Sequence, residues 1–349
     1  MSGAAMRLTA ATSGFVIFLL FTSVIQAQSD WGVIYHPTKI CALKGSTVNL
    51  LCSFTPPSKT DDGDTTLERA FWFTQRLYRE PVDLRTEPDY AGRVQYSHHN
   101  GVCNLTIADL RESDSAVYKF RLTTDRPDWR HTGEPGVTLS VTGFQVQKRQ
   151  FSSCVIASCK WAHLKCHSSC LPTYQTSFSW YKNGVKMQTE KESFYDNFYP
   201  ADSYSCAARG FEAFVSPSSC VTGQYCNRVT YAERRVCAFK GSSVNLSCKY
   251  QGYEYIASKF WFNPERSLVL RYRTQHKDLS KDPRYEGRVK VVETKGGRST
   301  LTITDLRESD SDEYLFKFNT PSFEWRSGLP GTTLTVTGTD EHTLIVQVM

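Results

Sequence analysis

The sequence predicts an all-β protein that consists of three β-sandwiches in tandem, and three observations lead to this prediction. The first is a long internal repeat: KICALKGSTVNLLC at residues 39–52 returns as RVCAFKGSSVNLSC at 235–248, and LTIADLRESDSAVYKF at 105–120 returns as LTITDLRESDSDEYLF at 301–316. The second is the alternation of apolar and polar residues within each copy, which is typical of strands buried on one face. The third is a shorter, less regular unit between the two copies, again with short strands separated by turn residues.

Residues 1–27 are predicted to form a secretory signal peptide. Arg7 gives a basic start, residues 14–25 are an apolar run, and Ala27 offers a small residue for cleavage. A membrane-spanning helix needs about 20 apolar residues, so this shorter run does not favour one. Export places the chain in an oxidising compartment, where its 12 cysteines are expected to pair as disulfides.

The length after the signal peptide suggests three domains, because domains of about 100 residues are common. We place them at residues 28–143, 144–222 and 223–338, with a short tail at 339–349. The tail is too short to cross a bilayer, so no membrane anchor is expected within this chain. The chain is then an extracellular or cell-surface protein, either soluble or the front part of a longer receptor.

The composition excludes some classes of function. The formal net charge is +6, from 41 basic and 35 acidic residues without a long basic run. This balance argues against a nucleic-acid partner and mildly favours an acidic ligand. The sequence contains no nucleophile elbow, HExxH motif, Walker loop or carboxylate pair in a recognisable frame. We therefore expect a recognition module that is not an enzyme and needs no cofactor.

Three kinds of residue narrow the sandwich to the immunoglobulin type. A buried tryptophan is expected after the first strand cysteine of each unit, a tyrosine corner before the sixth strand, and an arginine–aspartate pair at the bottom of a variable-type domain. The candidates are Trp72, Trp180 and Trp261 for the buried indoles, Tyr118 and Tyr314 for the corners, and Arg93–Asp114 and Arg288–Asp310 for the ion pairs. The first and third domains are therefore predicted to be variable-type.

The middle unit is predicted to be a constant-type domain. Cys166, Trp180 and Cys206 follow one another in the order that an immunoglobulin core requires, which predicts a Cys166–Cys206 bridge. The segment is too short for the extra strands of a variable-type domain. Pro200 stands where the aspartate of a tyrosine corner would lie, so this corner is imperfect.

The cysteines of the first unit are unusually placed. In most immunoglobulin domains the second cysteine lies two residues after the corner tyrosine, but Phe120 stands there and Cys103 lies on the preceding strand. A Cys52–Cys103 bridge would thus lie within one sheet, which can widen the gap between the sheets and expose the sixth strand. In this shift the chain resembles the siglecs, the sialic-acid-binding immunoglobulin-type lectins of leukocytes. The resemblance covers residues 28 to about 338 and is best to the B-cell branch of the family and its fish relatives.

The resemblance also implies a bridge between domains, from Cys41 to Cys170. Other cysteines stay open: Cys248 lacks a partner because Ser299 occupies the matching place, and Cys237 would need a further domain. The sequence assigns no partners to Cys154, Cys159, Cys220 and Cys226. A zinc site in the middle unit is disfavoured, because its cysteine and histidine spacing fits no common zinc motif.

The resemblance further implies a sialic-acid site in the first domain. Siglecs hold the sugar with an arginine on the sixth strand, a tryptophan near the N-terminus and another on the seventh strand, and Arg121, Trp31 and Trp129 stand at these places. Strand alternation turns Lys119 to the same face as Arg121. A guanidinium can meet both oxygens of a carboxylate, and indoles can pack on the glycerol chain and the N-acetyl methyl group. Sialylated glycans on glycoproteins or glycolipids are therefore the expected partners.

The third domain has Lys317 and Asn227 in place of the arginine and the first tryptophan, and only Trp325 remains. We therefore expect it to bind poorly. Two sequons, at Asn104 and Asn245, predict N-glycosylation on outward-facing strand positions. The main alternative is an adhesion or immune receptor that binds a protein counter-receptor without any glycan, because the same sandwich face serves both uses.

Overall fold

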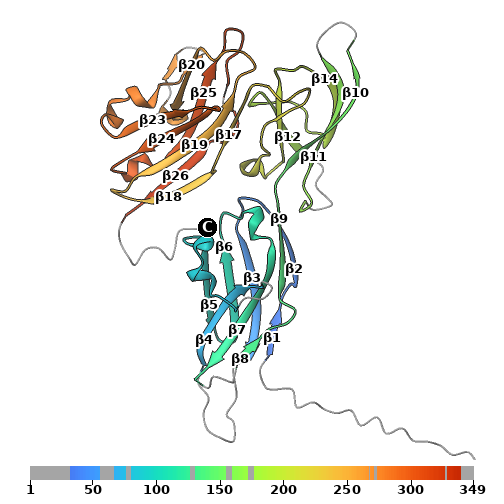
Figure 1. The fold of residues 1–349 in the computed structure, drawn as a ribbon, viewed down its shortest axis with the longest axis vertical. Coiled ribbons are helices and arrows are strands. Elements are labelled where there is room, and N and C mark those ends of the chain that lie inside the picture. Colours follow the sequence, from blue (N-terminus) through green and yellow to red (C-terminus); the bar gives the residue numbers. More distant parts are fainter. Residues whose placement is uncertain are drawn as a thin grey trace, which may run out of the picture.

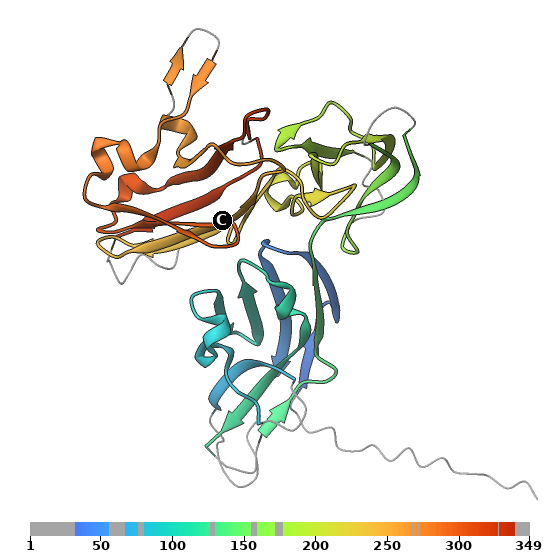
Figure 2. The ribbon, with the colours of Figure 1, turned by 45° about the horizontal axis from the view of Figure 1, so that its top comes forward.

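The computed structural model describes residues 32–55, 67–75, 80–125, 130–154, 159–171, 177–266, 268–270, 273–326 and 328–338. These residues form three β-sandwiches (Figure 1). The second and third sandwiches lie side by side, and the first extends from the second in both views (Figures 1 and 2). The predicted signal peptide and the predicted tail lie outside the described residues.

The first domain packs two sheets face to face. One sheet has the order β1-β3-β6-β5, and the other has the order β2-β9-β7-β4 with β8 paired to β7. The strands are β1 (Gly32–Tyr35), β2 (Lys39–Leu43), β3 (Val48–Thr55), β4 (Leu67–Thr74), β5 (Val94–His99), β6 (Val102–Ile107), β7 (Ala116–Thr124), β8 (Arg130–Thr132) and β9 (Val137–Thr142). Short 3-10 turns are η1 (Leu84–Thr86), η2 (Pro88–Tyr90) and η3 (Glu112–Asp114).

The second domain is smaller, as the sequence predicts for a domain without extra strands. Its sheets have the orders β10-β11-β14 and β13-β12-β15-β16. The elements are β10 (Gln145–Ser153), β11 (Lys160–His167), β12 (Phe178–Lys182), β13 (Val185–Lys186), β14 (Ser193–Phe198), β15 (Ser203–Ala208), η4 (Glu212–Phe214) and β16 (Ser219–Cys220).

The third domain repeats the topology of the first. Its sheets have the orders β17-β19-β24-β23 and β18-β26-β25-β20, and β21 and β22 form a separate hairpin. The strands are β17 (Arg228–Tyr231), β18 (Arg235–Phe239), β19 (Val244–Gln251), β20 (Ser258–Phe262), β21 (Leu268–Leu270), β22 (Arg273–Gln275), β23 (Val289–Thr294), β24 (Arg298–Ile303), β25 (Asp312–Asn319) and β26 (Thr332–Thr337). The 3-10 turns are η5 (Pro264–Arg266), η6 (Leu279–Lys281), η7 (Pro283–Tyr285) and η8 (Glu308–Asp310).

The marks of the immunoglobulin sandwich are all in place in the two copies. The Tyr118 hydroxyl donates to the Asp114 carbonyl at 2.7 Å, which is the tyrosine corner. Arg93 meets the Asp114 carboxylate through two hydrogen bonds of 2.8 and 2.9 Å. The third domain repeats both contacts from Tyr314 and Arg288 to Asp310. The fold class is therefore confirmed, down to the ion pair that closes each variable-type domain.

Aromatic rings fill the core where a second cysteine is absent. Phe120 is fully buried and packs against Trp72 with 5.5 Å between ring centroids. Cys52 and Cys103 face each other across β3 and β6, so their bridge lies within one sheet. Because sulfur leaves the space between the sheets, a benzyl ring takes that space and keeps the packing dense.

The structure also pairs most of the other cysteines. It joins Cys41 to Cys170 and Cys166 to Cys206, the two further bridges that the sequence analysis expects. Two pairs that the sequence leaves open are the short loops Cys154–Cys159 and Cys220–Cys226. Among the described cysteines, Cys237 is a free exposed thiol and Cys248 a free buried one.

The buried side chains divide unevenly among the domains. Most of those of the first domain form a cluster of their own; Leu43 belongs to the cluster of the other two domains, and Phe71 and Phe73 belong to neither. Those of the second and third domains form one continuous cluster. The second and third domains thus share a core, whereas the first is packed separately. Within the described part of the chain, no helix is long and apolar enough to span a membrane.

Candidate ligand-binding site

Strand β7 places the predicted anchor, Arg121, on the outer face of the first domain. Tyr118, Phe120 and Leu122 are fully buried, so alternation turns Arg121 away from the core. The side chain is half-buried, and it makes no hydrogen bond or ion pair with any residue that the structure describes. A guanidinium on an outer face has the geometry to meet both oxygens of a carboxylate.

Neighbouring strands surround Arg121 with an aromatic ring and two further cations. Phe71 on β4 and Thr132 on β8 lie directly opposite Arg121 in the register. Two residues further along β7, Thr123 lies opposite Arg69 on one side and Arg130 on the other. The Arg69 guanidinium lies 5.3 Å from the centroid of the Phe71 ring, where the ring face attracts it. The outer face therefore carries positive charge, over a Phe71 ring that is only 7% exposed.

Lys119, the other predicted contact, lies on the same face but is covered. Its side chain is only 8% exposed, and its ammonium donates to Glu134 at 2.7 and 2.5 Å. Glu134 itself is 69% exposed. Lys119 therefore holds the segment after β8 against β7, and its charge is already balanced by a carboxylate.

Tyr35 on β1 links the segment after β8 to strand β7 through two hydrogen bonds. Its hydroxyl donates to the Gly133 carbonyl at 3.2 Å and accepts from the Phe120 backbone N–H at 2.8 Å. Burial raises the pKa of Tyr35 to about 12, helped by the nearby Glu134 carboxylate and opposed by the Phe120 hydrogen bond. Burial also lowers the pKa of His131 on β8, so this imidazole is neutral at pH 7.

Two predicted site residues, Trp31 and Trp129, lie outside the described residues. The described residues that follow them in the sequence are Gly32, the first residue of β1, and Arg130, the first residue of β8. Strands β1 and β8 belong to the end of the first domain that points away from the other two domains (Figure 1). Arg69, Phe71 and Arg130 were not predicted as site residues. Alternation about the buried Trp72 places Phe71 on the other face of β4, but it does not show the register of Phe71 with Arg121.

The third domain allows an internal comparison, because its residues at the corresponding positions contact other residues of the chain. The Lys317 ammonium forms an ion pair with Glu324 and is 12% exposed. Asn227 is buried, and its side chain accepts a hydrogen bond from the Tyr253 backbone. Trp325 is 1% exposed and stacks on Phe318 with 5.9 Å between centroids and 14° between planes. Internal partners thus take the positions that would meet a ligand.

Comparison with known proteins agrees with the fold. Residues 231–337 match the family described as "Immunoglobulin V-set domain". The third domain is therefore an immunoglobulin V-set domain, in a chain of tandem immunoglobulin-like sandwiches. The tandem immunoglobulin-like domains and their disulfides are typical of the immunoglobulin superfamily and of an oxidising, secretory or extracellular environment. Immunoglobulin-domain proteins generally are not enzymes.

Structures of titin domains are among the solved structures that match the chain. A three-domain structure of titin domains I67–I69 with glutamate-to-alanine changes has a TM-score of 0.30 and 14% identity, and covers 88% of this chain and 99% of that chain. The titin Z1Z2 domains in complex with telethonin have a TM-score of 0.23 and 12% identity, and cover 88% of this chain and 96% of that chain. Scores this low carry no information on function.

Proposed function

We propose that the chain is an extracellular recognition protein whose first domain binds sialylated glycans through Arg121. One observation carries the proposal: alternation along β7 turns the Arg121 guanidinium to the outer face of the first domain, at the repeat position where the third domain has Lys317. A sialic acid carboxylate is ionised at neutral pH and matches the two parallel donors of a guanidinium. Lysine cannot form this bidentate pair, which fits a third domain without the same function.

The surroundings of Arg121 suit the same ligand. Arg69 and Arg130 place further positive charge two residues along the face, and the Arg69 guanidinium lies 3.9 Å from the Asp83 carboxylate. A small exposed site with one principal salt bridge binds weakly, with a dissociation constant near the millimolar range, or about −4 kcal/mol. Useful avidity then requires several copies on one surface.

The proposal is tested by binding to cells. The secreted chain, fused to an antibody Fc segment, is applied to cells before and after sialidase treatment, beside its Arg121→Ala form. Binding is expected to fall after either change. The matched control is Arg149→Ala, which removes an exposed arginine from β10 of the second domain. If sialidase and Arg121→Ala leave binding intact, the glycan proposal is wrong.

A second candidate function, binding of a protein counter-receptor, is favoured by one surface of the second domain. Trp161 on β11 and Tyr195 on β14 are 40% and 59% exposed, and their rings stack with 22° between planes. His163 packs on Tyr195 with 4.5 Å between centroids. Exposed tryptophan and tyrosine are enriched at protein–protein hot spots. In this case Trp161→Ser abolishes cell binding, and sialidase does not.

A further inference from the structure

The tip of the second domain's β12–β13 hairpin is a tight turn at Asn183 and Gly184. Both residues have positive φ, 51° and 78°, as a two-residue type I′ hairpin requires. The Asn183 side chain donates to Asp202 at 2.6 Å and accepts from the Ser203 backbone at 2.9 Å. The turn is therefore held in one conformation by its own domain.

This turn is docked on the third domain with no space for a side chain. The Gly328 backbone N–H donates to the Gly184 carbonyl at 2.8 Å and is shared with the Arg326 carbonyl of its own domain, also at 2.8 Å. A Cβ added to Gly184 would lie 2.9 Å from a ring carbon of Trp325 and 3.1 Å from the Arg326 carbonyl. A Cβ added to Gly328 would lie 2.6 Å from the Gly184 carbonyl. Glycine is thus required on both sides of the contact.

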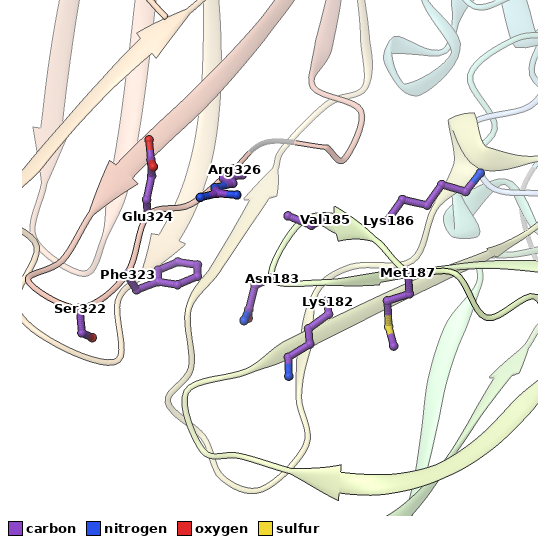
Figure 3. Close-up of a pocket in the computed structure, with 9 residues that line it drawn as sticks. All are labelled: Lys182, Asn183, Val185, Lys186, Met187, Ser322, Phe323, Glu324 and Arg326. Carbon is purple, nitrogen blue, oxygen red and sulfur yellow. The ribbon is translucent and has the colours of Figure 1, made fainter. Parts of the chain in front are cut away.

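The surrounding residues extend the contact. Figure 3 shows Asn183 and Val185 of the second domain facing Phe323 and Arg326 of the third, across a groove of about 440 Å³. The buried clusters of the two domains are continuous. Packed apolar surface and a hydrogen bond between backbones favour a single relative orientation.

The position of the contact determines whether this face of the third domain can bind a ligand. Trp325 and Lys317 are the repeat counterparts of Trp129 and Arg121. The turn at Gly184 therefore covers the face of the third domain that corresponds to the candidate site of the first. We infer that this face has become an interaction surface for the chain's own second domain, which joins the two domains into one rigid unit and closes the third domain to ligand. The statement about ligand rests on the proposed function, and the rigid joint does not.

The joint is tested with a matched pair of glycine variants in the full secreted chain. Gly184→Ala introduces a clash with Trp325, whereas Gly210→Ala does not, because nothing lies within 4 Å of a Cβ at Gly210. Both glycines belong to the second domain and have similar left-handed φ, 78° and 88°, so both variants bear the same backbone strain. Any difference between them reports the contact with the third domain.

The first readout is hydrogen–deuterium exchange at the Gly328 amide. Gly184→Ala is expected to speed this exchange, because the amide then keeps only the Arg326 carbonyl as an acceptor and becomes exposed to water, and Gly210→Ala is expected to leave it unchanged. The second readout is the distance distribution between spin labels on the second and third domains, which is expected to broaden in Gly184→Ala only. Equal behaviour of the two variants would overturn the inference.

A substitution in the third domain controls for misfolding of the second domain. Gly328→Ala is expected to broaden the same distance distribution while the second domain keeps its own exchange protection. If the distribution stays narrow in Gly328→Ala, the joint does not depend on this contact. Arg121→Ala leaves both readouts unchanged, so a failure of the glycan proposal and a failure of the joint are separate results.

Discussion

Trp261 donates a hydrogen bond of 2.9 Å from its indole Nε1 to the Ser299 hydroxyl in the buried core of the third domain. Ser299 lies directly opposite Cys248 across β19 and β24. The first domain has Cys103 at the corresponding position, bonded to Cys52, and there the Trp72 Nε1 has no hydrogen-bond partner among the described residues. One copy thus uses a disulfide in this place, and the other uses a hydroxyl that satisfies the tryptophan.

Ser299→Cys is predicted to form a bridge to Cys248 and to stabilise the third domain. Closing a loop of about 50 residues contributes up to about 4 kcal/mol in the chain-entropy model, and loss of the Trp261 hydrogen bond offsets about 1 kcal/mol. The melting temperature should therefore rise by about 10 °C or more, and the rise should vanish in reductant. Calorimetry with and without reductant measures both effects; a variant whose transition ignores reductant contains no such bridge.

Tyr35→Phe is predicted to destabilise the first domain by about 1 to 2 kcal/mol, because the Phe120 N–H then loses its acceptor in a buried place. It should also change the response to alkali. The folded pKa of Tyr35 is raised to about 12 from 10, so its contribution to stability is complete below pH 10 and is lost as the pH rises towards 12.

The measurement is the difference between the unfolding free energies of wild type and Tyr35→Phe from pH 8 to pH 12. The difference should shrink in the upper half of this range. A difference that stays constant up to pH 12 would mean that Tyr35 does not titrate differently in the folded and unfolded chains.

Glu134→Gln is predicted to strengthen binding of an anionic ligand to the first domain. Glu134 is the carboxylate that balances Lys119 on the same face as Arg121. Because Glu134 is largely exposed, the gain is small, below about 1 kcal/mol, and it fades as salt rises. Titration with a sialylated oligosaccharide at low and at high salt checks this; weaker binding of Glu134→Gln at low salt would contradict it.

The sequence was sufficient for the fold because the repeat shows each mark twice. Tyr118 with Asp114 and Tyr314 with Asp310 are local pairs four residues apart, and they form as predicted. The strand alternation also turned Arg121 outward correctly.

Contacts across turns and domains were not predictable in the same way. The pairing of Lys119 with Glu134 depends on how the chain returns after β8, which alternation does not encode. The contact of Gly184 with Trp325 depends on how two domains dock. The short Cys154–Cys159 and Cys220–Cys226 loops were among many pairings that cysteine count alone allows.

The central claim is that Arg121 is the anchor for a sialic acid carboxylate, and nuclear magnetic resonance titration tests it most directly. The isotope-labelled chain is titrated with 3′-sialyllactose and with lactose, beside Arg121→Lys and Arg121→Ala. Shifts of first-domain amides on β4, β7 and β8 should saturate near millimolar sialyllactose in wild type, weaken at least tenfold in Arg121→Lys, vanish in Arg121→Ala, and never appear with lactose. Equal shifts in wild type and Arg121→Ala, or with lactose, would contradict the account.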